Sequence, residues 1–143
     1  MDLPKPRLKG YPVECVVSEK FEAMVNLGAL NSRMKDFYDL WLMLRCFNFD
    51  GAKLAEALKR TFKHRKTSLP KDKPLFAEEI FNEQSDRQIL WQAFLKKEDI
   101  KHAPKQLSNI AKEIEKFLIC PLNAIKKSEA FNKKWKATGP WEA

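Results

Sequence analysis

Apolar residues recur at helical spacing along most of this chain, and this pattern constrains its fold more than any other feature. The spacing predicts helices from about 13 to 27, 32 to 47, 51 to 64, 85 to 97 and 104 to 119. Two shorter candidates are residues 76–81 and a segment after Pro121. No stretch alternates strictly enough to indicate a strand, and only four glycines are present. We therefore expect an all-α fold, a bundle of five to seven helices.

Prolines and capping residues indicate where these elements end. Pro4 and Pro6 exclude a regular helix at the start, so residues 1–11 are expected to form a linker or arm. The helical domain is expected over 12–130, followed by an irregular tail over 131–143. The other boundary signals are Asn31 or Ser32, Asp50, the Ser85–Gln88 capping box, Pro104 at a helix start, and Pro121 as a break or kink.

The charge balance favours acidic partners. The chain carries 27 Lys and Arg against 19 Asp and Glu, a formal net charge of +8, and a basic surface suits nucleic acid. The segment Lys59 to Lys73 is the most basic candidate for guiding an RNA backbone. Its alternative interpretation, a solvated helix end and loop, is the simpler one.

Cysteine usage and hydropathy point to the cytoplasm. Cys15, Cys46 and Cys120 are widely spaced, with no Cys/His cluster, so a structural zinc site is not expected. Three buried thiols in a reducing cytoplasm are the plainest interpretation. The polar start does not resemble a signal peptide, and no run approaches the ~20 apolar residues of a membrane span.

Two helices carry charges where the helical pattern predicts apolar side chains. Lys20 falls inside the apolar arc of the first helix. Asp36 lies on the flank of the apolar arc of the second helix, Asp39 shares its side, and Arg33 projects towards the same arc from the first turn. One interpretation is a buried Lys20–Asp36 ion pair that sets the register of the two helices. The other is a charged cleft shared with a ligand or another domain, where the Lys binds phosphate.

The same segments resemble a known family. YPVE at 11–14 and SEKFEA at 18–23 resemble the "YPxE…AEKxEA" segment of the AbiEii/AbiGii toxins, with Ser18 in place of the usual Ala. NSRMKDFYDLW at 31–41 resembles their "NSRxKDxxDL" segment. The remaining matches are scattered along the chain: Phe49-Asp50-Gly51, Thr61-Phe62 with Arg65, Trp91 with Phe94-Leu95, and Phe117-Leu118 with Pro121.

The resemblance implies a polymerase-β-like nucleotidyltransferase that acts as a toxin, with an antitoxin encoded nearby. Related toxins transfer a nucleotide from a nucleoside triphosphate (NTP) to the acceptor end of tRNA, so tRNA or another RNA is the implied partner. Lys20 corresponds to the essential Lys of the family's EK motif, and Asp36 to the essential Asp of its RxKD motif. The supporting or nucleotide-binding positions are Glu19, Arg33, Lys35 and Asp39.

The chain departs from the family in one respect. The family's earlier motif, Gly-Ser followed by Asp-x-Asp, holds Mg²⁺ and the triphosphate, and neither sequence occurs here. We therefore expect a truncated or partial enzyme, similar to the family's C-terminal helical part, inactive alone and without a metal site or cofactor of its own. Mg²⁺, NTP and a nucleotidyltransferase core domain are expected only of the complete enzyme.

The alternative is a non-enzymatic helical module, left from a decayed toxin gene, that binds nucleic acid or protein. In either case the face bearing Lys20 and Asp36 is expected to be a groove with apolar walls. The 1–11 arm or a second copy of the chain, as a homodimer, would cover it.

Overall fold

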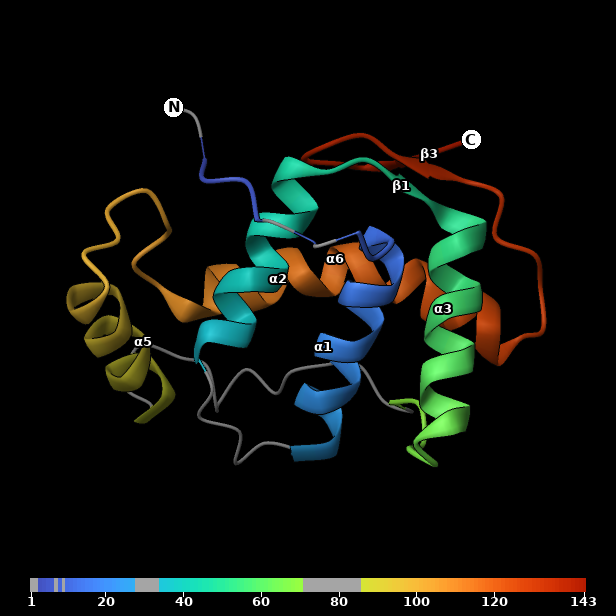
Figure 1. Cartoon of the computed structure of the whole chain (residues 1–143), viewed down its shortest axis with the longest axis horizontal. Coiled ribbons are helices and arrows are strands. Elements are labelled where there is room, and N and C mark those ends of the chain that lie inside the picture. Colours follow the sequence, from blue (N-terminus) through green and yellow to red (C-terminus); the bar gives the residue numbers. More distant parts are fainter. Residues whose placement is uncertain (1–2, 7, 9, 28–33, 71–85) are drawn as a thin grey trace.

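The computed structural model describes residues 3–6, 8, 10–27, 34–70 and 86–143. Over these residues the chain is mostly helical, with five helices and a small antiparallel sheet (Figure 1). In chain order the elements are α1 (Val13–Leu27), α2 (Met34–Cys46), β1 (Phe49–Asp50), α3 (Gly51–His64), α5 (Asp86–Lys97), α6 (Leu107–Lys126), β2 (Lys134–Trp135) and β3 (Trp141–Glu142).

The core lies where α1, α2 and α3 pack on one another and on α6. Helix α1 contacts α2 and α3, and α6 contacts α2, α3 and α5. Helix α5 lies at the opposite end of the molecule from α3 (Figure 1). The largest side chains that are fully removed from solvent are Trp41, Trp91, Phe21 and Phe117. Burial of this apolar surface is the main stabilising term for such a bundle.

The predicted helical fold is confirmed, and the start of α3 shows why the local signals worked. Asp50 accepts hydrogen bonds from the backbone N–H groups of Ala52, at 3.0 Å, and Lys53, at 3.4 Å. These two N–H groups have no partner within the helix, so the side chain caps it. The predicted cap at Asn31 or Ser32, the Ser85 half of the capping box and the candidate helix at 76–81 lie outside the described residues.

The predictions about the last helix were wrong at both ends. Helix α6 begins at Leu107 rather than Pro104, because the side chain of Gln88 accepts a hydrogen bond from the Leu107 N–H at 2.7 Å. It then continues through Pro121 to Lys126. A proline inside a helix costs about 3 kcal/mol. Pro121 and Leu122 are both buried here, so packing of the apolar face outweighs that cost.

The tail also differs from the expected irregular structure, since it contains two of the three strands. The sheet order is β1-β2-β3, and Trp135 lies opposite both Phe49 and Trp141. The Trp135 indole donates to the Leu44 carbonyl at 2.7 Å, and the Trp141 indole donates to the Phe117 carbonyl at 2.8 Å. The tail is therefore joined to α2 and α6. Among the described residues, no helix combines the length and hydropathy that a membrane crossing requires.

Candidate functional site

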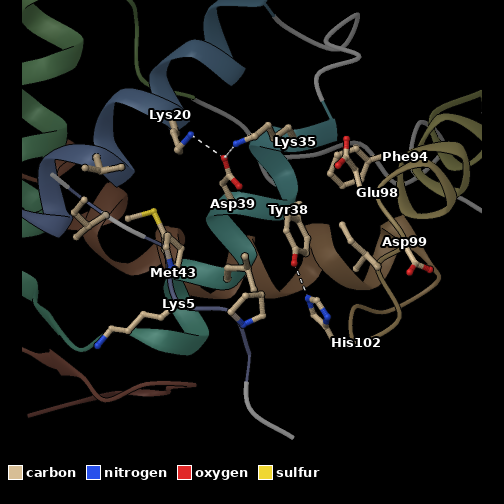
Figure 2. Close-up of a pocket in the computed structure, with 16 residues that line it drawn as sticks. Lys5, Lys20, Lys35, Tyr38, Asp39, Met43, Phe94, Glu98, Asp99 and His102 are labelled. Atoms are coloured by element: carbon tan, nitrogen blue, oxygen red, sulfur yellow. Dashed lines mark hydrogen bonds and ion pairs between the residues drawn. The ribbon is translucent and has the colours of Figure 1, made fainter.

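Lys20 of α1 points at the carboxylate of Asp39 on α2 (Figure 2). Its ammonium lies 3.9 Å from Asp36 Oδ1 and 3.1 Å from Asp39 Oδ2, to which it donates a hydrogen bond. The predicted juxtaposition of Lys20 and Asp36 is confirmed, but Asp39 is the nearer partner. The two aspartates are three residues apart on one side of α2, so both reach the same cation.

Asp39 is shared between two lysines. Lys35, one helical turn earlier on α2, donates to the same Oδ2 atom at 2.7 Å. Its side chain is 74% exposed, whereas that of Asp39 is 15% exposed. Glu19 is exposed on α1 and is not among the residues that line the groove described below. Arg33 lies outside the described residues.

The charged side chains of this cluster differ in how deeply they are buried. The Asp36 side chain is 7% exposed and that of Lys20 is 28% exposed. The cluster thus lies at the edge of the core, where Coulomb attraction is screened less than at the surface and one side of the ammonium stays open. The predicted Lys20–Asp36 ion pair exists, and Lys20 and Asp39 of the same cluster also line a cleft.

The cleft is a groove of about 680 Å³ between α1, α2, the end of α5 with the segment after it, and the N-terminal arm. Its walls are partly apolar, as expected, and the arm forms one of them. Its lining, within the described parts of the chain, consists of Pro4, Lys5, Pro6, Leu8, Val16, Lys20, Lys35, Tyr38, Asp39, Leu42, Met43, Phe94, Glu98, Asp99, Ile100 and His102. The charged cluster lies on one side of it, and Tyr38, Phe94 and His102 lie on the other (Figure 2).

The arm contacts the chain just after the end of α2. The Lys5 ammonium lies 4.7 Å from the centroid of the Phe47 ring, which is a cation–π contact. Lys5 and His102 also line a second cavity of about 630 Å³, together with Trp41 and Arg45. The arm therefore lines both cavities, whereas the expectation that the arm or a second copy of the chain covers the groove stays a prediction.

The Tyr38–His102 pair was not predicted. The Tyr38 hydroxyl lies 2.5 Å from His102 Nε2, across 64 positions of sequence. Burial raises the pKa of the Tyr38 phenol, and the negative charge of Asp39 raises it further. Tyr38 therefore stays a neutral hydrogen-bonding group at physiological pH. The place of Tyr38 inside the family-like segment NSRMKDFYDLW was the one available signal, whereas nothing near His102 in the sequence marked it.

Glu22 forms a second unpredicted network behind the site. It is 1% exposed, and its carboxylate accepts hydrogen bonds from Arg65, at 3.0 Å, and from the Thr67 hydroxyl, at 2.5 Å. These contacts join α1 to the end of α3. Because Glu22 is two residues from Lys20, the network holds the segment of α1 that carries the lysine.

The carboxylates of the site do not fit Mg²⁺. Asp36 and Asp39 both face the Lys20 ammonium, and Asp39 also faces Lys35. A divalent cation would have to displace those ammonium groups. In the described parts of the chain, no three His, Cys, Asp or Glu side chains cluster in a way that could hold a metal ion. The cysteines are free thiols, and all three are partly exposed rather than buried.

Comparison with known proteins identifies the family. The family model described as nucleotidyl transferase AbiEii toxin, type IV toxin–antitoxin system, matches residues 1–118 of the 143. No curated protein and no solved structure matches the chain. The match contains α1, α2 and the whole groove, while β2 and β3 lie beyond it. The chain therefore belongs to the AbiEii nucleotidyl transferase toxin family.

Proposed function

We propose that the groove binds the phosphates of an NTP in a nucleotidyl transfer reaction, with Lys20 as the phosphate contact. The observation that carries this proposal is the position of the Lys20 ammonium. It is held 3.1 Å from Asp39, yet 28% of its side chain remains exposed at the groove. A lysine so placed is already oriented before the ligand arrives, which lowers the entropic cost of binding.

The chemistry of the cluster suits an oxyanion. A lysine ammonium has three N–H donors, so one can remain on Asp39 while the others bind phosphate oxygens. Lys35 is 74% exposed and can turn from Asp39 to the same ligand. Asp36 and Asp39 then act as positioning residues for Lys20. As negative charge develops on the phosphoryl group in the transition state, the fixed ammonium stabilises it.

The acceptor in this proposal is the end of an RNA such as tRNA. The net charge of +8 supports a polyanionic acceptor. The family is also one of toxins in toxin–antitoxin systems, so an antitoxin is the expected protein partner in the cell. Lys59, Lys63 and Lys66, on and after α3, are exposed and are available to an RNA backbone.

We further propose that these 143 residues are one part of the complete enzyme. They contain neither Gly-Ser nor Asp-x-Asp, and the aspartates of the site are engaged with lysines. The carboxylates that hold Mg²⁺ would then come from a nucleotidyltransferase core outside these residues. Without them the chain can bind phosphate but cannot align an in-line attack.

The test measures transfer of each labelled NTP to total tRNA in the presence of Mg²⁺. The chain alone should show no transfer, and addition of a family core domain that carries Gly-Ser and Asp-x-Asp should restore it. Lys20→Ala should reduce the restored rate roughly 100-fold or more. Lys112→Ala, an exposed position on α6, is the matched control and should leave the rate unchanged.

Two outcomes would contradict the proposal. Transfer by the chain alone, lost in Lys20→Ala, would show that no separate core is needed. Restored transfer that survives Lys20→Ala, in a variant whose circular-dichroism spectrum is unchanged, would remove Lys20 from the phosphate site.

A further inference from the structure

The far side of the groove, away from the lysines, is built from aromatic and apolar side chains. The Tyr38 ring lies 5.7 Å from the Phe94 ring and 5.8 Å from the His102 ring, measured between centroids. The Phe94 ring in turn stacks on Trp91 at 5.6 Å. These side chains come from α2, from α5 and from the segment between α5 and α6, so three parts of the chain converge on one surface (Figure 2).

This surface is rigid and still accessible. Tyr38 is buried, with 9% of its surface exposed, and its hydroxyl is held by His102. Phe94, Ile100 and His102 are only partly buried, and all three line the groove. A planar apolar ligand can therefore pack on them without displacing the core, and the Tyr38–His102 hydrogen bond keeps their arrangement in place.

Charge orients any ligand that spans the groove. Lys20 and Lys35 lie beside Asp39, whereas Glu98 and Asp99 lie on the side of Phe94 and His102 (Figure 2). Glu98 and Asp99 are exposed, and Asp99 lies 3.8 Å from the ammonium of Lys101. The ammonium groups of Lys20 and Lys35 therefore attract a phosphate to the other side of the groove.

We infer that the aromatic side of the groove, formed by Tyr38, Phe94, Ile100 and His102, is a subsite for the base of the nucleotide. This inference rests on the proposed function, because the phosphates of the same nucleotide are placed at Lys20. A groove of about 680 Å³ has the size of a small-molecule site. Stacking on aromatic rings accepts every base, since each has a π-face. The subsite therefore supplies affinity without selecting one base.

The experiment compares two ligands that differ in the base. Isothermal titration calorimetry of the full chain measures the dissociation constants of tripolyphosphate and of each of the four NTPs. Tripolyphosphate carries no base and no less negative charge, so tighter binding of an NTP reports on the base. We expect NTPs to bind roughly 5- to 150-fold more tightly.

The variants locate the effect. Phe94→Leu keeps an apolar side chain but removes the ring. The ratio of the tripolyphosphate dissociation constant to the NTP dissociation constant should therefore fall towards one, while tripolyphosphate binding is retained. Ile89→Ala, on the same helix but 62% exposed and outside the groove, is the matched control and should keep the preference. Lys20→Ala should weaken both ligands.

The results that would contradict the base subsite differ from those that would contradict the phosphate site. Equal binding of tripolyphosphate and NTPs, or a preference that Phe94→Leu leaves intact, would overturn the base subsite and leave the phosphate site standing. Tripolyphosphate binding that is unaffected by Lys20→Ala would contradict the proposed function instead. If neither tripolyphosphate nor any NTP binds, both proposals are wrong.

Discussion

The contribution of Lys20 to stability should depend on its burial rather than on its distance from Asp39. Lys20→Met removes the ammonium and keeps a side chain of similar length. The pair at 3.1 Å has side chains that are 28% and 15% exposed. It falls between surface pairs, worth about 0–1 kcal/mol, and buried pairs, whose disruption costs about 3–5 kcal/mol. We expect Lys20→Met to lower the free energy of unfolding by about 1–2 kcal/mol.

Lys35 provides the matched control for this argument. It contacts the same Asp39 oxygen at the shorter distance of 2.7 Å, but its side chain is 74% exposed. Distance alone predicts a larger loss for Lys35→Met than for Lys20→Met. Solvent screening predicts a loss of only about 0.3–0.5 kcal/mol, as for other exposed pairs one helical turn apart.

Urea-induced unfolding, followed by circular dichroism, measures these differences through the transition midpoint and slope. Asp39→Asn and the Lys20→Met/Asp39→Asn double variant complete a double-mutant cycle. The double variant should be less destabilised than the sum of the single variants by about 1 kcal/mol. A coupling below about 0.3 kcal/mol, or a Lys35→Met loss equal to that of Lys20→Met, would refute the reasoning.

Three further changes probe the rest of the fold. Gly51→Ala should lower the melting temperature although alanine is the better helix former, because its methyl group would lie 2.4 Å from the Lys133 carbonyl oxygen. Glu22→Ala should lower the free energy of unfolding in urea by about 2–4 kcal/mol, because it removes the buried carboxylate that accepts hydrogen bonds from Arg65 and Thr67. A loss under about 0.5 kcal/mol would contradict this. The hydrogen bond from Lys134 lowers the pKa of Asp50. The resulting stability is present above the unfolded pKa of about 3.9 and is lost as pH falls through the lower folded pKa. Lys134→Met should therefore reduce the melting temperature near neutral pH and have no effect in strong acid, and an equal reduction at both would refute the assignment.

The sequence by itself determined the helices and the pairing of charges between two of them. Helical periodicity and the cap at Asp50 predicted α3 with its observed bounds, because both are local properties of the chain. Lys20 and Asp36 were predicted to meet because each interrupts an apolar arc, and apolar arcs of neighbouring helices face one another. The motif segments also indicated the family, which the match over residues 1–118 establishes.

The tertiary structure decided which groups touch. A helical wheel places Asp36 and Asp39 on one side but does not give the axial offset between two helices, so it could not show that Asp39 is nearer to Lys20. The Tyr38–His102 contact and the Gln88 cap on α6 join residues that are 64 and 19 positions apart. No local signal encodes such distances.

The small sheet shows most clearly that local sequence signals do not predict contacts between distant residues. Its strands have two residues each, too short to display any alternation. They form because Trp135 and Trp141 bury their rings against Phe117 and donate to the carbonyls of α2 and α6. Likewise, α6 continues through Pro121 because the side chains of Leu118, Pro121 and Leu122 are buried. In both places local propensity was weak or opposed, and the free energy of burying apolar surface against distant parts of the chain set the outcome.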